Sequence, residues 1–372
     1  MKFGSSARAL INLGCVVLLF SAGTTLVSVG LVATHPPPVL VYPRPRQTTS
    51  LSAVLPTTVH DLLLLDIFST SCTSALGPAN LRELLIIVPE NELPIFRDRY
   101  AAKQPANWYF VSERQIVPEY HRLGVGLSGW LRQQDMKLAA YRNVTSDFYL
   151  ALDSDNVCLK PKLNASEYIQ DGKAYACLES IRGGSRFHGK HDVPKTVAAL
   201  SSVLGIEANS SAHSHVMGWT PQILSKTLLT SINDIFLSRS HQQQSLVTYL
   251  LSNGRPRQAC FDKFGREQCL KNVWTEYLAY YILAKRFNLW DEYHNDVIAE
   301  GIEVGTCYSA QNKHAIYRPY CLKQRLECVG DLVQILSRTV EKRPMFGTLN
   351  DHKLKPQDLI SLRDIVKNVS WT

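Results

Sequence analysis

The order of short apolar runs and helical stretches between residues 61 and 155 constrains the fold more than any other feature of the sequence. Apolar runs of strand length occur at "DLLLLDIF" (61–68), "ELLIIVP" (83–89), "NWYFVS" (107–112) and "DFYLALDSD" (147–155). Stretches with helical spacing separate them at 90–104 and at the amphipathic "GWLRQQDMKLAAYRNV" (129–144). Strands that alternate with helices predict an α/β domain with a mixed, mainly parallel sheet and flanking helices.

The sequence beyond residue 155 continues to mix the two element types. The predicted segments are a strand at 173–180, a helix at 193–205, a strand and then a helix with Pro221 in its first turn at 214–236, helices at 242–253, 273–287 and 354–369, and a loop with a short strand at 305–321. We expect one globular domain over residues 56–345, followed by a C-terminal tail with a helix over residues 346–372.

An apolar stretch at residues 9–33 follows Lys2 and Arg8 near the N-terminus. A membrane helix needs about 20 apolar residues, and the apolar core of a signal peptide only roughly 7–15. The length therefore favours an uncleaved transmembrane signal anchor, with a cleaved signal peptide as the alternative. The positive charges before the stretch predict a cytosolic tail at residues 1–8, and the proline-rich residues 34–55 predict an extended stem.

Two further features indicate that the body of the chain enters the secretory pathway. Eight of the nine cysteines lie beyond the apolar stretch, an even number that suits disulfide bonds, and no C-x-x-C pair is present. The second feature is a set of four N-glycosylation sequons, at Asn143, Asn164, Asn209 and Asn368. We expect a single-pass type II protein of the Golgi or ER membrane with a lumenal body.

The net charge of +8 is not gathered in a basic arm, which argues against nucleic acid as a partner.

The apolar run at residues 148–152 stops abruptly at Asp153, Ser154 and Asp155. If the strand continued that far, the two carboxylates would share one face, since side chains at i and i+2 of a strand point the same way. Mg²⁺ and Mn²⁺ favour such oxygen ligands and complete their shells with water and substrate phosphates. The pattern predicts a divalent metal site, with a solvated strand end as the alternative.

Other proteins with closely spaced aspartates fit this pattern less well. Haloacid-dehalogenase-like phosphatases place Asp-x-Asp on the first strand of the domain and usually follow it with Gly-Thr, whereas Asn156 and Val157 follow it here, after at least three strands. A membrane-anchored phosphatase that forms an aspartyl-phosphate on Asp153 is therefore a third, less favoured reading. An EF-hand loop is excluded because its glycine and its terminal glutamate are missing.

The predicted anchor and stem, the α/β half and a mid-chain strand that ends in Asp-x-Asp together resemble the GT-A glycosyltransferases. The pattern is most similar to poorly characterised glycosyltransferase-like families with "GW-x-RQQ-x-x-K" before an "LDSDN" strand, here residues 129–137 and 152–156. The resemblance covers most of residues 55–325. It implies a Rossmann-like GT-A domain behind the transmembrane helix, a nucleotide-sugar donor and Mn²⁺ or Mg²⁺ as cofactor.

The resemblance also implies roles for individual residues. Asp153 and Asp155 would bind the metal and the nucleotide-sugar, with Asp155 the more direct metal ligand. Gln134 and Lys137 could reach the donor from the preceding helix, although a solvated helix face is an equally simple reading. His314, in "NKHAIYRPY", faintly resembles the histidine that completes the metal shell in some members, but its spacing departs from that pattern.

Two further segments offer residues for the acceptor. Glu276 lies in the apolar "VWTEYLAYY", where burial would raise its pKa toward that of a useful base; an ordinary solvated helix position is the alternative. His215 and Trp219, in "HSHVMGWTPQIL", could contact an acceptor sugar, although a histidine buried in the core is the commoner outcome.

The sequence therefore favours a metal-dependent glycosyltransferase that transfers a sugar from a nucleotide-sugar to a glycan, glycoprotein or lipid acceptor. Most of its catalytic power would come from electrostatics and positioning. The alternative is a non-catalytic lumenal protein of similar fold that binds a glycan or a protein partner. The donor sugar, the acceptor, the linkage, the stereochemistry and the disulfide pairing do not follow from these residues.

Overall fold

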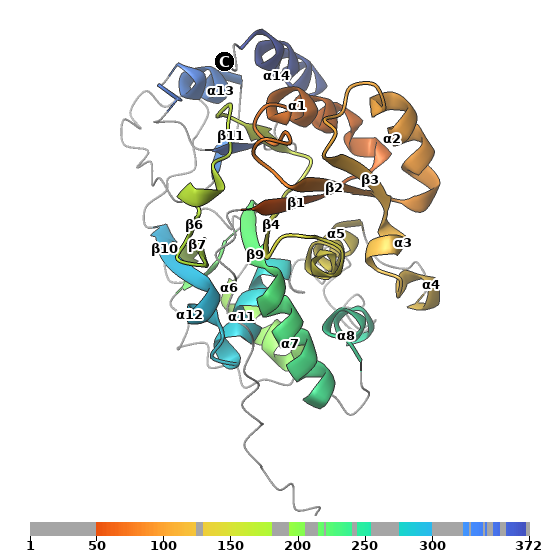
Figure 1. The fold of residues 1–372 in the computed structure, drawn as a ribbon, viewed down its shortest axis with the longest axis vertical. Helices are drawn as coiled ribbons and strands as arrows, with labels where there is room; N and C mark the ends of the chain where they lie inside the picture. Colours follow the sequence, from red (N-terminus) through yellow and green to blue (C-terminus); the bar gives the residue numbers. More distant parts are fainter. Residues whose placement is uncertain are drawn as a thin grey trace, which may run out of the picture. The chain divides into compact units, whose positions relative to one another are not determined.

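The computed structural model divides into two units, Met1–Val41 and Tyr42–Thr372, and every described residue belongs to the second (Figure 1). The described residues are 50–123, 129–180, 193–204, 215–218, 221–239, 244–253, 275–299, 323–326, 329–337, 339–340, 345–349 and 355–369. No helix among them is both long enough and apolar enough to cross a membrane. The predicted anchor at residues 9–33 lies outside the described residues.

A five-stranded sheet in the order β3-β2-β1-β4-β9 organises the described part of the chain. Its strands are β1 (Leu51–Pro56), β2 (Glu83–Val88), β3 (Trp108–Ser112), β4 (Phe148–Ala151) and β9 (Gln222–Ser225). The first four pair in parallel, and β9 pairs antiparallel to β4. The predicted α/β class with a mixed, mainly parallel sheet is confirmed.

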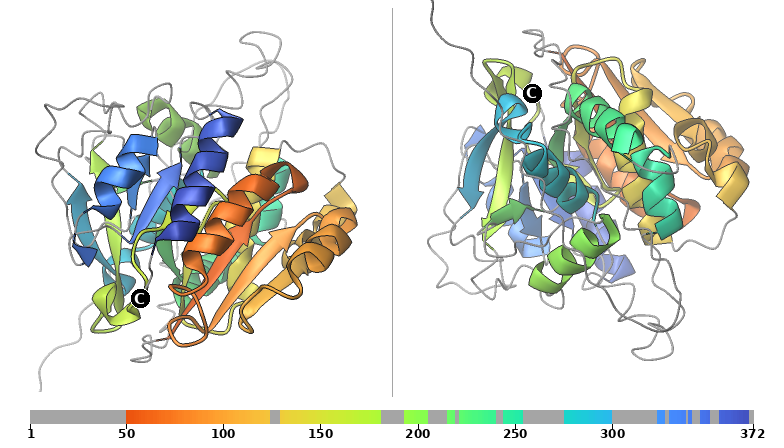
Figure 2. Two further views of the ribbon diagram at one scale, coloured as in Figure 1. Left: turned by 90° about the horizontal axis from the view of Figure 1, so that it is seen from above. Right: turned by 90° about the horizontal axis from the view of Figure 1, so that it is seen from below.

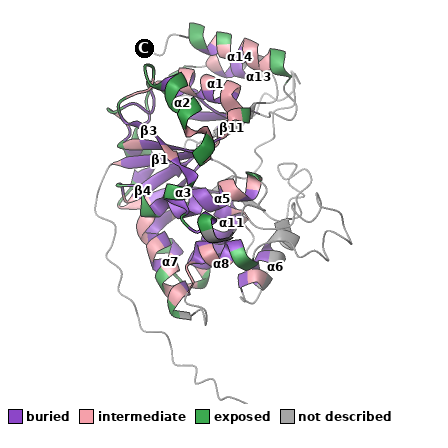
Figure 3. Ribbon diagram, turned by 90° about the vertical axis from the view of Figure 1, so that its right-hand side faces the viewer, coloured by how far each residue is buried: buried purple, intermediate pink, exposed green. Residues whose placement is uncertain are grey.

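Helices cover both faces of this sheet (Figure 1). Because side chains alternate along a strand, Ala53 and Leu55 join one apolar cluster while Val54 joins the other. The first cluster includes α1 (Leu62–Cys72) and α2 (Leu93–Tyr100), and the second includes α5 (Gly129–Ala139), α7 (Lys226–Arg239), α8 (Leu246–Asn253) and α11 (Glu276–Arg286). The strands of this sheet are largely buried, and exposed residues lie on the outer helices and in the loops (Figure 3).

The first predicted strand, residues 61–68, is wrong, because this run lies in helix α1. Its buried residues Leu64, Leu65, Ile67 and Phe68 follow the spacing of a helical face, whereas a short continuous apolar run cannot by itself distinguish the two structures. The strand that precedes it is β1, whose six residues are all buried. The sheet thus starts at Leu51. The predicted stem (34–55) ends too late, because its last five residues lie in β1.

Two smaller sheets complete the described strands. One has the order β10-β7-β6 with β8 also paired to β7, and the other has the order β11-β12-β5. Their strands are β5 (Asn156–Cys158), β6 (Ile169–Gln170), β7 (Lys173–Ser180), β8 (His215–Met217), β10 (His294–Ala299), β11 (Lys323–Leu326) and β12 (Phe346–Leu349). The predicted strand at 173–180 is confirmed as β7.

The remaining described α-helices are α3 (Glu113–Ile116), α4 (Tyr120–Leu123), α6 (Val193–Leu204), α12 (Trp290–Tyr293), α13 (Val329–Leu336) and α14 (Pro356–Asn368). The structure confirms the helices predicted within 90–104, 129–144, 193–205, 242–253, 273–287 and 354–369. Pro221 is not in the first turn of a helix, since strand β9 lies between it and α7. The predicted loop at 305–321 lies outside the described residues.

Residues 346–349 and 355–369 pack within the folded domain, so the predicted boundary that separates a C-terminal tail at 346–372 from the domain is wrong. Strand β12 pairs antiparallel with β5, and α14 packs beside α1 (Figure 2, left view). Leu362 and Val366 of α14 join an apolar cluster with Leu64 and Ile67. A disulfide between Cys72 and Cys158 ties the end of α1 to β5, and Cys177 is also disulfide-bonded.

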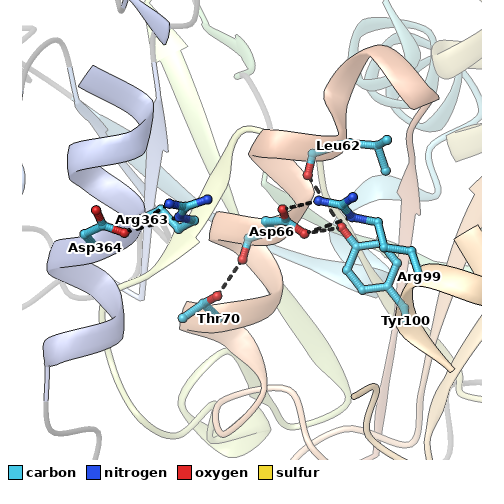
Figure 4. A network of polar contacts seen from close by, with 7 residues as sticks. All are labelled: Leu62, Asp66, Thr70, Arg99, Tyr100, Arg363 and Asp364. Carbon is cyan, nitrogen blue, oxygen red and sulfur yellow. Dashed lines mark hydrogen bonds and ion pairs between the residues drawn. The ribbon is translucent and has the colours of Figure 1, made fainter. Parts of the chain in front are cut away.

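A polar contact joins α1 to α2 (Figure 4). Asp66 accepts a hydrogen bond from the Tyr100 hydroxyl at 2.6 Å and pairs with the Arg99 guanidinium at 2.6 Å. Burial acts to raise the pKa of Asp66, but the bonds from Arg99 and Tyr100 and the charge of Arg363 on α14 lower that pKa below its ordinary value. The carboxylate therefore stays charged and links α1 to α2.

Candidate functional site

The two aspartates lie in a tight turn between β4 and β5. Strand β4 ends at Ala151, and the Asn156 N–H donates to the Asp153 carbonyl at 3.1 Å. The Asn156 side-chain oxygen accepts from the Asp153 N–H at 3.0 Å, so a second bond closes the same turn. The expectation that the strand continues through Asp155 is therefore wrong. Within this turn, hereafter the acidic turn (Asp153–Asn156), Ser154 is buried and both aspartates are partly exposed.

The acidic turn lies at the carboxyl end of β4, next to the carboxyl end of the parallel strand β1. The Leu152 N–H donates to the Val54 carbonyl at 2.9 Å, so pairing with β1 continues up to the residue before the turn. Ligands of open α/β sheets bind outside the carboxyl ends of the strands. The position of the turn in the sheet is therefore one at which a ligand can bind.

A buried lysine joins the acidic turn to two helices. Lys137 of α5 places its Nζ 2.5 Å from Oδ1 of Asp153 and 2.9 Å from Oε1 of Glu276, at the start of α11. Its side chain is only 1% exposed. Burial acts to lower the pKa of Lys137, but the two carboxylates outweigh it and hold that pKa well above its ordinary value. Lys137 is thus a buried, charged ammonium that pairs with one carboxylate oxygen of Asp153.

Neighbouring hydrogen bonds fix this lysine in place. The Tyr149 hydroxyl of β4 donates to the Lys137 carbonyl at 2.7 Å. The side-chain oxygen of Gln134, one turn earlier on α5, accepts from the Glu276 N–H at 3.2 Å and so satisfies a free donor at the start of α11. Thr275 caps the same helix by accepting from the Leu278 N–H at 3.2 Å.

Glu276 is enclosed rather than presented to solvent. It is 2% exposed, and burial raises its pKa, while Lys137 acts to lower that pKa and Asp153 acts to raise it. The predicted direction, a pKa of Glu276 raised by burial, agrees with the structure. The charged group that contacts this carboxylate, however, is the ammonium of Lys137.

The structure brings together four of the residues selected from the sequence: Gln134, Lys137, Asp153 and Glu276. Asp155 lies two residues further along the acidic turn. His215 is half-buried on β8, in a different sheet. Trp219, His314 and Asn209 lie outside the described residues. The sequon residues Asn143, Asn164 and Asn368 are exposed, as an attached glycan would require.

The acidic turn fits a hard divalent cation that keeps several water ligands. Its two partly exposed carboxylates supply oxygen, and Mg²⁺ or Mn²⁺ needs only one or two of these beside substrate phosphates. Asp153 and Glu276 both pair with the single ammonium of Lys137, an excess of negative charge that a divalent cation would help to balance. No group of three metal-binding side chains occurs within the described ranges.

Sequence reasoning missed the residues that hold the site together. The Asn156 side chain accepts a hydrogen bond from the Asp153 N–H. The Tyr149 hydroxyl donates one to the Lys137 carbonyl of α5. The signal for Asn156 was present, because a run of Asp, Ser, Asp and Asn is typical of a turn and not of a strand. No local signal identifies Tyr149, whose partner becomes visible only in the folded chain.

The chain belongs to a protein family without an assigned activity. A family model described as "Family of unknown function (DUF6492)" matches residues 48–309, which span every described element from β1 to β10. A search of curated proteins finds no match. Membership thus places the acidic turn inside the shared region without assigning it a reaction.

Solved structures similar to this chain include two glycosyltransferases and a synthase. Mouse xyloside xylosyltransferase 1 is 9% identical with a TM-score of 0.40, covering 82% of this chain and 100% of that one. Galactosyltransferase LgtC, solved with donor and acceptor sugar analogs, is 8% identical with a TM-score of 0.36, covering 86% and 97%. Glucosyl-3-phosphoglycerate synthase from Mycobacterium tuberculosis, solved with Mn²⁺ and uridine-diphosphate, is 18% identical with a TM-score of 0.29, covering 61% and 74%. With TM-scores below 0.5, these similarities assign no role to a residue here.

Proposed function

We propose that this protein is a GT-A glycosyltransferase that uses a divalent metal, Mn²⁺ or Mg²⁺, and a nucleotide-sugar donor. The acceptor would be a glycan, a glycoprotein or a lipid of the secretory pathway. One observation carries the proposal: the acidic turn follows a parallel strand at its carboxyl end, and a buried ammonium holds one of its two carboxylates. Such an edge of an α/β sheet suits a ligand with a charged diphosphate.

The two aspartates would take different parts. Because Lys137 engages an oxygen of Asp153, we assign the direct metal contact to Asp155 and a contact with the donor to Asp153. A bound ion would stabilise the negative charge of the nucleotide diphosphate as it leaves. Lys137 would hold the Asp153 carboxylate in its orientation, so that the turn needs little rearrangement when the donor binds.

Glu276 is better suited to position Lys137 than to accept a proton from the acceptor. Its carboxylate is buried and bonded to the ammonium at 2.9 Å, which makes a line of Glu276, Lys137 and Asp153 from the start of α11 to the acidic turn. Gln134 supports the same line through the Glu276 N–H. His215 and Trp219 stay proposals for the acceptor side, and His314 stays a proposal for the metal.

The proposed location in the Golgi or ER, with a lumenal body, is supported by two features of the described residues. The disulfide between Cys72 and Cys158 suits an oxidising compartment. Three sequon asparagines are exposed, and Asn143 precedes β4, at the end of that strand away from the acidic turn. A glycan there would leave the proposed donor site open. The apolar stretch at residues 9–33 would supply the anchor.

Hydrolysis of a panel of nucleotide-sugars in the presence of Mn²⁺ tests the proposal. We expect the full chain to release nucleotide diphosphate from at least one donor. Asp155→Ala should lower this rate on the order of 100-fold, the loss typical of removing one group that stabilises developing charge. Asp98→Ala is the matched control, since Asp98 is an exposed aspartate on α2. Absence of turnover on every donor would rule out the enzyme.

A non-catalytic role is the second candidate, favoured by the enclosure of Glu276 against Lys137. In that case the protein would bind a nucleotide-sugar or a glycan without converting it. The two candidates separate in a single experiment: a donor that binds in a metal-dependent way but is never hydrolysed, with or without an acceptor, identifies the binding protein.

A further inference from the structure

The side chain of Asn156 connects both ends of the acidic turn. A backbone N–H can only donate, so the N–H of Asp153 requires the oxygen of the Asn156 amide, 3.0 Å away. This orientation leaves Nδ2 to donate to Oδ1 of Asp155 and to Oγ1 of Thr348, each at 3.3 Å. Asn156 is completely buried. Its amide therefore fixes the Asp155 carboxylate relative to the start of the turn.

Strand β12 holds this arrangement from the other side. Thr348 pairs with Asn156 in the antiparallel register, and its hydroxyl accepts from the Asn156 amide. The neighbouring Leu349 N–H donates to the Asp155 carbonyl at 2.8 Å. A side chain and a backbone group of the same strand thus contact two successive residues of the turn.

Strand β12 lies outside the region that defines the family. The family model matches residues 48–309, whereas β12 covers Phe346–Leu349. The strand is held there by its pairing with β5, and α14 after it packs on α1. The shared region thus contains the acidic turn, and a segment C-terminal to it supplies the outer support.

We propose that β12 is a positioning element for the metal site, in which Thr348 acts through Asn156 on the Asp155 carboxylate. This inference rests on the proposed function, since it assumes that Asp155 binds a divalent metal. Groups that hydrogen-bond a ligating carboxylate fix its orientation and set metal affinity. Thr348 is one bond further out than Asn156, so its loss should weaken metal binding without removing it.

Binding of Mn²⁺ to the full chain, measured from the electron paramagnetic resonance signal of the free ion, tests this role. Thr348→Val keeps the shape of the side chain and removes the acceptor. We expect it to weaken Mn²⁺ binding about fivefold, the equivalent of one neutral hydrogen bond. Thr348→Ser restores the hydroxyl and should bring the affinity back. Thr230→Val is the control, because it removes a hydroxyl that bonds to the Lys226 carbonyl in α7.

The outcomes separate this inference from the proposed function. If the unaltered chain does not bind Mn²⁺, the metal site of the proposed function fails, and the inference fails with it. If the chain binds Mn²⁺ and Thr348→Val binds it equally well, only the positioning role fails. Equal weakening by Thr348→Val and Thr230→Val would indicate general loosening of the fold and would also overturn the role of β12.

Discussion

A buried histidine makes the stability of this protein depend on pH. His294, at the start of β10, is 3% exposed, and its Nε2 lies 2.6 Å from the Tyr280 hydroxyl. Its Nδ1 lies 3.2 Å from the Ala174 carbonyl, which can only accept, so Nδ1 carries the proton and Nε2 accepts from Tyr280. Burial lowers the pKa of His294 to about 3, against the bond to Ala174, which acts to raise it; the charge of Lys285 also lowers it.

The sign and size of the effect follow from the two pKa values. Between pH 6.5, the ordinary histidine value, and about 3, the unfolded chain binds a proton that the folded chain does not. The free energy of unfolding therefore falls as the pH falls through this window. From pH 7.5 to pH 5.0 the loss due to His294 amounts to about 2 kcal/mol, since one and a half pKa units lie between 6.5 and 5.0.

Urea unfolding at pH 7.5 and pH 5.0 measures this loss when the variant His294→Gln is compared with the unaltered chain. Glutamine keeps a donor and an acceptor but does not titrate. The other titratable groups contribute equally to the pH-dependent loss of unfolding free energy in both proteins. The pH-dependent loss should be smaller in the variant by about 2 kcal/mol. Parallel losses in the two proteins would show that His294 is not held neutral in the folded chain, and the reasoning from its burial would be wrong.

Three further experiments test the contacts around the site and the fold. Lys137→Met leaves the carboxylates of Glu276 and Asp153 without their ammonium and should cost about 3–5 kcal/mol of unfolding free energy in urea titrations. The control Lys285→Met removes a surface ion pair and should cost less than about 1 kcal/mol. Replacing Cys72 and Cys158 together by alanine opens a bridge with a sequence separation of 86 and should cost about 4–5 kcal/mol by thermal or urea unfolding; no change would mean that the bridge is not formed. Tyr149→Phe should cost about 1 kcal/mol through the lost bond to the Lys137 carbonyl, and a shift of the unfolding midpoint reports it.

Elements whose apolar pattern agrees with their length could be predicted from the sequence. Strands β2 and β3 lie within their predicted segments because each is an apolar run of strand length, and α5 and α11 lie within segments that are too long for a typical strand. The errors occur where that pattern is ambiguous. The run at 61–68 is apolar almost throughout, and its helical structure follows from packing against the sheet and α14.

The composition of the candidate site could be predicted, whereas its connections could not. Lys137 and Gln134 were selected from one helix, Asp153 from the end of a strand and Glu276 from an apolar helix more than a hundred residues later. Nothing in the local sequence indicates that these residues contact one another, since the contacts depend on how α5 and α11 pack. The same reason explains why Glu276 was expected to serve the acceptor, whereas the folded chain pairs it with Lys137.

The proposed function requires that the acidic turn forms a metal-dependent donor site. Thermal unfolding of the full chain with a panel of nucleotide-sugars, with and without Mn²⁺, measures whether it does. A donor at about 100 times its Kd should raise the melting temperature of the unit Tyr42–Thr372 by about 4 °C. We predict that at least one nucleotide-sugar produces this shift only when Mn²⁺ is present, and that Asp155→Ala abolishes it. A panel without any Mn²⁺-dependent shift, or a shift that persists in Asp155→Ala, would contradict the account.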